Sequence, residues 1–194
     1  MDDIPPDPQR RNWQSHAAIL DATVEQLASV GYHRLTIEGI AARAGVSKAT
    51  VYRWWPTKAR LIIEALSKHS DIEPVAATGD VRADARALVH RVIEIMTKTP
   101  LGQALPHLAA DFKDDPQART DLIEWLGRIR ASHRALLYEA AGRGDLPYDI
   151  DADLILDLLA GTVTYRYLFA DRVDDRLVDQ LADLIVNGQL PRAG

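Results

Sequence analysis

The sequence contains no cysteine among its 194 residues. Disulfide bonds, thiolate metal sites and cysteine nucleophiles are therefore excluded, and a reducing cytoplasm is a compatible environment. No apolar run approaches the roughly 18 residues that a membrane-spanning helix needs. The opening residues, MDDIPPDPQRR, also lack the apolar segment of a signal peptide. We expect a cytoplasmic protein with no membrane partner.

Catalytic and metal-binding patterns are missing as well. The six histidines are scattered, with no pair four residues apart as in a helical zinc site. There is no G-x-S-x-G motif, and the turn GRGDLP lacks the spacing and the following lysine of a phosphate-binding loop. Asp111, Asp114 and Asp115 cluster at a helix junction, where capping explains them. The sequence predicts no metal site, no cofactor and no enzymatic activity.

Strand-like alternation with a period of two is absent, whereas apolar residues recur at helical spacings of three and four. The sequence therefore predicts an all-α fold of about nine helices. Gly102 and Pro106 are expected to make the sixth helix short, kinked or split. The expected helices cover about 13–30, 36–44, 47–55, 57–66, 80–99, 101–112, 115–140, 151–170 and 174–187.

The stretch Leu35 to Lys58, LTIEGIAARAGVSKATVYRWWPTK, has the features of a helix-turn-helix. Thr36 is a favoured N-cap for a first helix. Gly45 ends that helix, because glycine readily takes the left-handed conformation that a tight turn needs. Ser47 is a good N-cap for a second helix, which Pro56 terminates because proline donates no amide and disfavours helix in the preceding residue.

The second helix of this motif carries side chains suited to DNA. Lys48 and Tyr52 lie four residues apart, as do Ala49 and Arg53, so these side chains share one outward region. Residues 39–63 contain five basic residues and no acidic one, which favours a phosphate partner. The competing interpretation of any single basic helix is an ordinary solvated surface.

A second anion site is expected where the next helix begins. Thr57 can cap that helix, which places Lys58 and free backbone amides at its N-terminus. Such a terminus attracts anions, so we expect it to clamp the DNA backbone.

This stretch resembles the N-terminal domain of TetR/AcrR-type transcriptional regulators. The order of glycine, serine, threonine, tyrosine, aromatic and lysine is specific to that family's pattern. One departure is Trp54-Trp55-Pro56, where Trp55 can replace a phenylalanine as a core residue and Trp54 occupies a position that contacts DNA in relatives. The matching residues are Thr36, Ile40, Ala41, Ala44, Gly45, Val46, Ser47, Thr50, Val51, Tyr52, Trp55, Lys58 and Leu61.

The resemblance implies roles in binding double-stranded DNA. Tyr52 and Arg53 would meet base edges in the major groove or flanking phosphates, Lys48 and Thr50 would hold phosphate, and Thr36 would anchor the first helix to the backbone. The predicted DNA-binding set is Thr36, Ser47, Lys48, Ala49, Thr50, Tyr52, Arg53, Trp54 and Lys58.

The domain organisation follows from composition and from the resemblance. Residues 1–11 are expected to be a disordered tail, residues 12–70 a three-helix DNA-binding domain with its connecting helix, and residues 71–194 a larger helical domain for effector binding and dimerisation. Residues 1–68 carry nine basic and seven acidic side chains, and residues 69–194 carry fourteen and twenty-one. The overall net charge of −5 thus does not argue against DNA, because only local charge matters for a DNA footprint.

The resemblance also implies an effector pocket and a homodimer interface in the larger domain. For each pocket candidate, the competing interpretation is an ordinary core aromatic or a hydrogen-bonded histidine. Trp125 and His133 share a helix face with Ile129 and are the first pocket candidates. The predicted pocket residues are Met96, His107, Phe112, Trp125, Ile129, His133 and Tyr165. The predicted dimer-interface residues, on the last two helices, are Leu158, Gly161, Thr162, Tyr165, Leu177, Leu181 and Leu184.

The sequence is therefore interpreted as a homodimeric, one-component transcriptional regulator, most simply a repressor. Its two heads would occupy half-sites of a roughly palindromic operator about 34–36 Å apart. An unidentified small-molecule effector would release it by changing the separation of the heads. Two alternatives remain: a DNA-binding or architectural protein without an effector, and an all-α enzyme or carrier.

Overall fold

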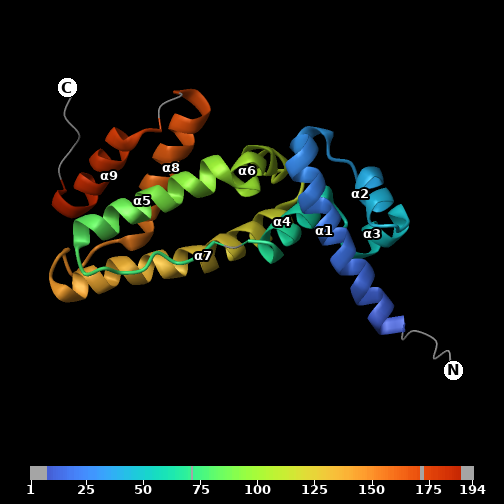
Figure 1. Ribbon diagram of the computed structural model, residues 1–194, viewed down its shortest axis with the longest axis horizontal. Helices are drawn as coiled ribbons and strands as arrows, with labels where there is room; N and C mark the ends of the chain where they lie inside the picture. The colour runs from blue at the N-terminus through green and yellow to red at the C-terminus, as the bar shows by residue number, and fades with distance from the viewer. Residues whose placement is uncertain (1–7, 71, 171–172, 189–194) are drawn as a thin grey trace. The chain divides into compact units, whose positions relative to one another are not determined.

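The chain is built entirely from helices in the residues that its computed structural model describes, which are 8–70, 72–170 and 173–188. This confirms the all-α prediction and its count of about nine helices (Figure 1). None of the described helices is long and apolar enough to cross a membrane. The helices are α1 Pro8–Arg34, α2 Ile37–Arg43, α3 Lys48–Trp54, α4 Lys58–Lys68, α5 Val81–Lys98, α6 Pro100–Asp111, α7 Pro116–Arg143, α8 Ala152–Phe169 and α9 Asp175–Asn187.

Two predictions about helix limits need correction. Residues 8–11 of the predicted tail belong to α1, whereas residues 1–7 lie outside the described residues. Helix α6 is unbroken, so the predicted split does not occur. Pro106 removes one backbone hydrogen bond, which α6 tolerates because Ala104 and Leu108 on either side are fully buried.

The chain divides into two compact units, and these differ from the predicted domains. The first unit comprises Met1–Asp71 and Gln103–Glu124, and the second comprises Ile72–Gly102 and Trp125–Gly194. Residues 103–124 group with residues 1–71 rather than with the rest of the chain. Within the first unit, side chains of Thr57 and Arg60, at the start of α4, contact the start of α7, as described below.

The first unit encloses a small core beneath the helix-turn-helix. Helix α1 packs on α4 and α2, and α2 packs on α3. The fully buried side chains include Ile19, Leu27, Ile40, Val51 and Leu61, each of which stabilises the unit by roughly 1.5–3 kcal/mol. Trp55 is also buried, as expected of a core residue.

The second unit is organised around α5, which packs on both α9 and α8 (Figure 1). Leu88 and Val89 of α5 are fully buried, as is Val163 of α8. Ion pairs then fix the helices laterally: Arg82 and Arg86 of α5 pair with Asp183 and Asp179 of α9. Helix α7 is tied to α8 by the pairs Arg130–Asp157 and Arg134–Asp153.

Candidate DNA-binding site

The turn between α2 and α3 is built by the local chemistry that the sequence predicts. The Oγ1 of Thr36 accepts a hydrogen bond from the Gly39 amide at 3.1 Å, which caps α2. Gly45 has a φ of 66°, the left-handed conformation that only glycine adopts easily. The Oγ of Ser47 accepts from the Thr50 amide at 3.1 Å, which caps α3. The predicted caps and turn are confirmed.

Helix α3 has one buried and one exposed face. Val51 is completely buried, and Trp55, which lies four residues later, directly after the helix, is also buried. Lys48, Ala49 and Arg53 are exposed, and Tyr52 keeps 48% of its surface accessible. The exposed face therefore presents a cation, a methyl group, a phenol and a guanidinium together, as the sequence predicts.

Trp54, which the sequence predicts as a DNA contact, is partly buried and packs against α1. Its ring centroid lies 4.7 Å from that of His16 and 6.2 Å from that of Trp13, both on α1. Its Nε1 is buried and has no hydrogen-bond partner among the described residues, so it does not reach a phosphate from this position. The indole instead fixes α3 to α1.

The remaining members of this aromatic cluster hold the end of α3 in place. The His16 ring also lies 4.7 Å from the Trp55 ring. The carboxylate of Glu64, on α4, contacts both His16 and Trp55. Trp55 Nε1 donates to Glu64 at 2.8 Å, and His16 Nε2 lies 3.3 Å from the same carboxylate. We did not predict this cluster from the sequence, although the spacing of Trp13 and His16 at i, i+3 is a signal for it.

The cations around α3 differ in their partners. Lys48 pairs with Glu38 of α2, and Arg43 pairs with Glu25 of α1. The hydrogen bond to Lys48 lowers the pKa of Glu38, and the same bond raises the pKa of Lys48. Arg53 instead donates from Nη2 to the neutral amide oxygen of Asn12 at 3.3 Å. Within the described residues, Arg53 thus keeps its full positive charge without a carboxylate partner.

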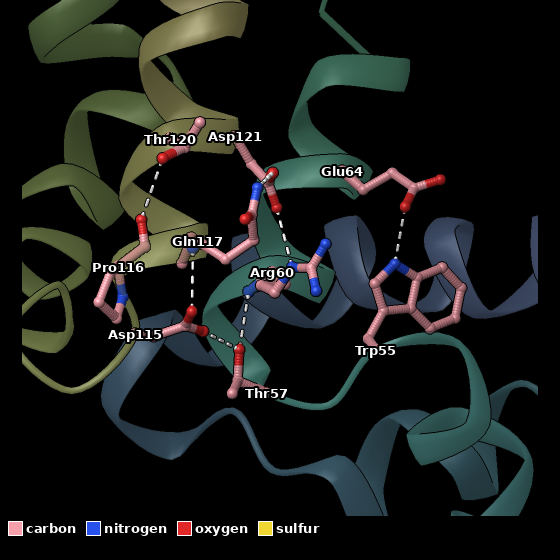
Figure 2. Close-up of polar contacts among 10 residues, drawn as sticks. Trp55, Thr57, Arg60, Glu64, Asp115, Pro116, Gln117, Thr120 and Asp121 are labelled. Carbon is pink, nitrogen blue, oxygen red and sulfur yellow. Dashed lines mark hydrogen bonds and ion pairs between the residues drawn. The ribbon is translucent and has the colours of Figure 1, made fainter.

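The N-terminus of α4, where the sequence predicts a phosphate clamp, contacts the acidic side chain of Asp115 (Figure 2). Thr57 caps α4 by accepting from the Arg60 amide at 3.3 Å, and its hydroxyl donates to Asp115. Arg60 donates to Asp121 of α7 at 2.9 Å. Asp115 also caps α7 by accepting from the Ala118 amide at 2.9 Å, so its carboxylate serves both helices.

Electrostatics keep this junction charged. Burial raises the pKa of Asp115, but the hydrogen bonds from Thr57 and the Ala118 amide and the nearby Arg60 outweigh it, so the net shift is downward. Asp115 is 58 residues from Thr57 in sequence, so no local pattern predicts their contact.

Lys58, a predicted phosphate contact, lies against Tyr32 in the chain without DNA. Its Nζ lies 4.1 Å from the centre of the Tyr32 ring and donates to the Tyr32 carbonyl oxygen at 3.3 Å. The Tyr32 hydroxyl donates to Asp111, and burial together with this carboxylate raises the tyrosine's pKa. His107 stacks on the Tyr32 ring with centroids 5.1 Å apart.

The predicted pocket residues divide between the two units. His107 and Phe112 belong to the first unit, which includes residues 103–124. Met96, Trp125 and His133 are buried in the second unit, and Ile129 is partly buried there. Tyr165 is 63% exposed and packs beside Phe169, so it lies on the surface of this unit rather than in its interior.

The predicted dimer residues also separate by exposure. Leu158, Gly161 and Tyr165 are exposed on α8, and Thr162 is partly buried. Leu177 and Leu181 of α9 are only 5% exposed within the single chain. Their apolar stripe is used within the chain, where α9 packs on α5. Leu184 is partly buried.

Comparison with known proteins agrees with this architecture. Residues 19–65 match the family described as "Bacterial regulatory proteins, tetR family", and residues 75–185 match the "Tetracyclin repressor-like, C-terminal domain". The uncharacterised HTH-type transcriptional regulator YdeS of Bacillus subtilis is 31% identical over 179 residues, covering 91% of this chain and 89% of YdeS. The DNA-binding transcriptional repressor TetR of Mycobacteroides abscessus is 31% identical over 173 residues, covering 86% and 89%.

Solved structures show the same fold. The TetR family transcription regulator SCO0332 is 33% identical and superposes with a TM-score of 0.73, covering 92% of this chain and all of that one. FadR from Bacillus subtilis, solved in complex with stearoyl-CoA, is 21% identical with a TM-score of 0.56, covering 90% and 99%, and so shares the fold.

The capped turn, the exposed basic face of α3 and the helical second unit define a helix-turn-helix, DNA-binding transcriptional regulator. The chain belongs to the TetR family, whose two domain descriptions together span most of its length.

Proposed function

We propose that this chain is a homodimeric repressor that binds a roughly palindromic operator through α3 and releases it when a small molecule binds the second unit. The observation that carries the proposal is the exposed face of α3, where Arg53 has no carboxylate partner among the described residues. The proposed DNA-facing residues are Thr36, Ser47, Lys48, Ala49, Thr50, Tyr52 and Arg53.

The chemistry of these side chains supports separate roles. Arginine can donate two parallel hydrogen bonds to guanine, and the Arg53 guanidinium is exposed, so we assign it to base edges in the major groove. Lys48 and Thr50 would contact phosphate. The Thr36 oxygen accepts from Gly39, which leaves its hydroxyl hydrogen to donate to a phosphate at the start of α2.

An exposed apolar stripe on α8 supports the dimer. Leu154, Leu158, Tyr165 and Phe169 are all at least half exposed, and they recur at helical spacings along one side of α8. Gly161 lies on the same side, and a Cβ placed there would meet nothing within 4 Å, so the backbone is open to a close neighbour. A contiguous exposed apolar surface of this kind is typical of a protein interface, and we assign it to a second copy of this chain.

The small-molecule effector rests on the fold and on the family. The chain matches the tetracyclin repressor-like C-terminal domain over residues 75–185. FadR, a chain of the same fold, was solved in complex with stearoyl-CoA. A ligand that binds the operator-competent and the released conformations with different affinity would shift their populations, with a coupling of about 1–3 kcal/mol.

The decisive experiment is selection of bound duplexes from a random DNA pool with the wild-type protein and with Arg53→Ala. Arg128→Ala is the matched control, because Arg128 is an exposed arginine of the second unit. We expect a palindromic motif that Arg53→Ala loses or relaxes at about 1–3 kcal/mol per half-site, while Arg128→Ala preserves it. Enrichment of no motif, or a motif indifferent to Arg53→Ala, would overturn the proposed function.

A further inference from the structure

His133 of α7 is a buried histidine with an unsatisfied ring nitrogen. The residue is 3% exposed, and its Nε2 has no hydrogen-bond partner among the described residues. A buried polar atom without a partner is costly, and folded proteins keep few of them. Such an atom is explained when a ligand supplies the missing partner.

Apart from Arg130, the residues one and two turns from His133 on its face of α7 are apolar. Trp125 lies two turns before it and Leu137 one turn after it, and both are buried. Leu136 and Ala140 are buried on the same helix. A ligand that binds Nε2 should therefore be mainly apolar apart from the group that contacts this nitrogen. A strongly polar ligand would lose its hydration against these apolar side chains, which costs free energy.

Two arginines act on His133 electrostatically. Arg130 lies one turn before it on α7, and Arg91 of α5 is close enough to act on it electrostatically. Burial lowers the pKa of His133, and the positive charges of Arg91 and Arg130 lower it further, so the imidazole is neutral at neutral pH. Each arginine keeps about 29% of its side chain exposed and has one acidic partner, Glu94 at 3.4 Å for Arg91 and Asp157 for Arg130.

A neutral imidazole can present an N–H at Nε2, and this donor lies in a region that favours negative charge. An amine would bring a third positive charge to the same region, and a neutral amide would gain less from the arginines than an anion does. A carboxylate would satisfy the donor and be stabilised by both guanidiniums.

We propose that His133, flanked by Arg91 and Arg130, holds the head group of a small apolar carboxylate in the second unit. This inference rests on the proposed effector-controlled function and names the chemical class of the effector. The partner that Nε2 lacks is then the carboxylate oxygen of the ligand.

The test uses the full-length chain without DNA. The probes form two matched series, benzoate, benzamide and benzylamine, and decanoate, decanamide and decylamine, with binding measured by thermal shift and by titration calorimetry. We expect at least one carboxylate to bind about tenfold or more tightly than its matched amide, because the hydrogen bond is charge-assisted, and we expect no binding of the amines.

The variant His133→Leu should abolish the preference for the carboxylate while raising the melting temperature of the free protein, because it removes the unsatisfied nitrogen. His133→Gln, which keeps a donor, should retain part of the preference. His90→Leu is the control, because His90 is an exposed histidine of α5 in the same unit, and it should bind as the wild type does.

Equal affinity for carboxylate and amide, binding that persists unchanged in His133→Leu, or binding of none of the six probes would each overturn the inference. Operator binding is measured separately on the same preparations. A protein that binds its operator but shows no carboxylate preference refutes this inference alone, whereas a protein that binds no operator refutes the proposed function.

Discussion

Gly102, near the start of α6, marks a close approach of two backbones inside the second unit. A Cβ added at this glycine would lie 2.0 Å from the Met96 carbonyl oxygen and 2.7 Å from that of Ile95. Favourable contacts of carbon begin at roughly 3.5 Å, so Gly102→Ala would force the backbones apart by more than about 1 Å. The obstacle is backbone rather than a side chain, so it cannot rotate away.

Two opposing terms set the size of this effect. Alanine in place of glycine favours a helix by about 1 kcal/mol. Overpacking a buried position costs about 1–3 kcal/mol or more, and a contact this short with backbone belongs at the upper end. We expect Gly102→Ala to lower the free energy of unfolding by about 2 kcal/mol or more. The melting temperature should then fall by roughly 4–8 °C for a chain of this size.

Gly127 of α7 provides the matched control. A Cβ at Gly127 would meet nothing within 4 Å, so Gly127→Ala gains only the helix propensity and should raise the melting temperature by a few degrees. Thermal and urea denaturation followed by circular dichroism measure both variants. If Gly102→Ala were as stable as the wild type, or if both alanines shifted the melting temperature in the same direction, the steric reasoning would be refuted.

Three other predictions concern charge. Glu38→Gln should tighten DNA binding several-fold at low salt, because it removes the anion paired with Lys48 beside the proposed DNA-facing surface, and a fluorescence anisotropy titration showing weaker binding would contradict this. Asp84→Asn should lower the free energy of unfolding by about 1–3 kcal/mol in urea denaturation, because the buried carboxylate accepts two hydrogen bonds from Thr78; unchanged stability would count against those bonds. Because folding lowers the pKa of His133, the unfolded chain binds a proton at this histidine more readily than the folded chain does. The free energy of unfolding should therefore fall as the pH drops below 6.5, the ordinary pKa of histidine, by at most ~1.4 kcal/mol per pH unit from this group. A series of urea denaturation midpoints against pH should be flatter for His133→Leu than for the wild type.

The local structure of the DNA-binding motif could be predicted because short-range chemistry determines it. Thr36 and Ser47 cap their helices within three residues, and Gly45 adopts its left-handed conformation without any distant partner. These features depend only on neighbouring residues, so the sequence pattern is sufficient to place them. The same holds for Asp80, whose side chain accepts hydrogen bonds from the first amides of α5.

Features that depend on distant residues could not be predicted. Thr57 contacts Asp115 at the place where the sequence predicts a phosphate site. Asp115 is 58 residues away, so no local sequence pattern predicts this contact. Leu177 and Leu181 show a second limit: an apolar stripe on α9 has the same pattern whether it packs within its own chain or against another copy. Exposure on the folded unit separates the two patterns: the apolar stripe of α9 is buried within the chain, and an apolar stripe of α8 is exposed.

The aromatic cluster beside α3 has a practical consequence for spectroscopy. Three of the chain's four tryptophans, Trp13, Trp54 and Trp55, lie in this cluster with His16 among them. Native tryptophan emission is therefore weighted towards the end of the molecule that carries α3, and Trp125 contributes from the second unit. With Trp125 replaced by phenylalanine, all tryptophan emission excited at wavelengths that tyrosine does not absorb would come from the cluster beside α3, so that operator docking can be followed without an attached dye.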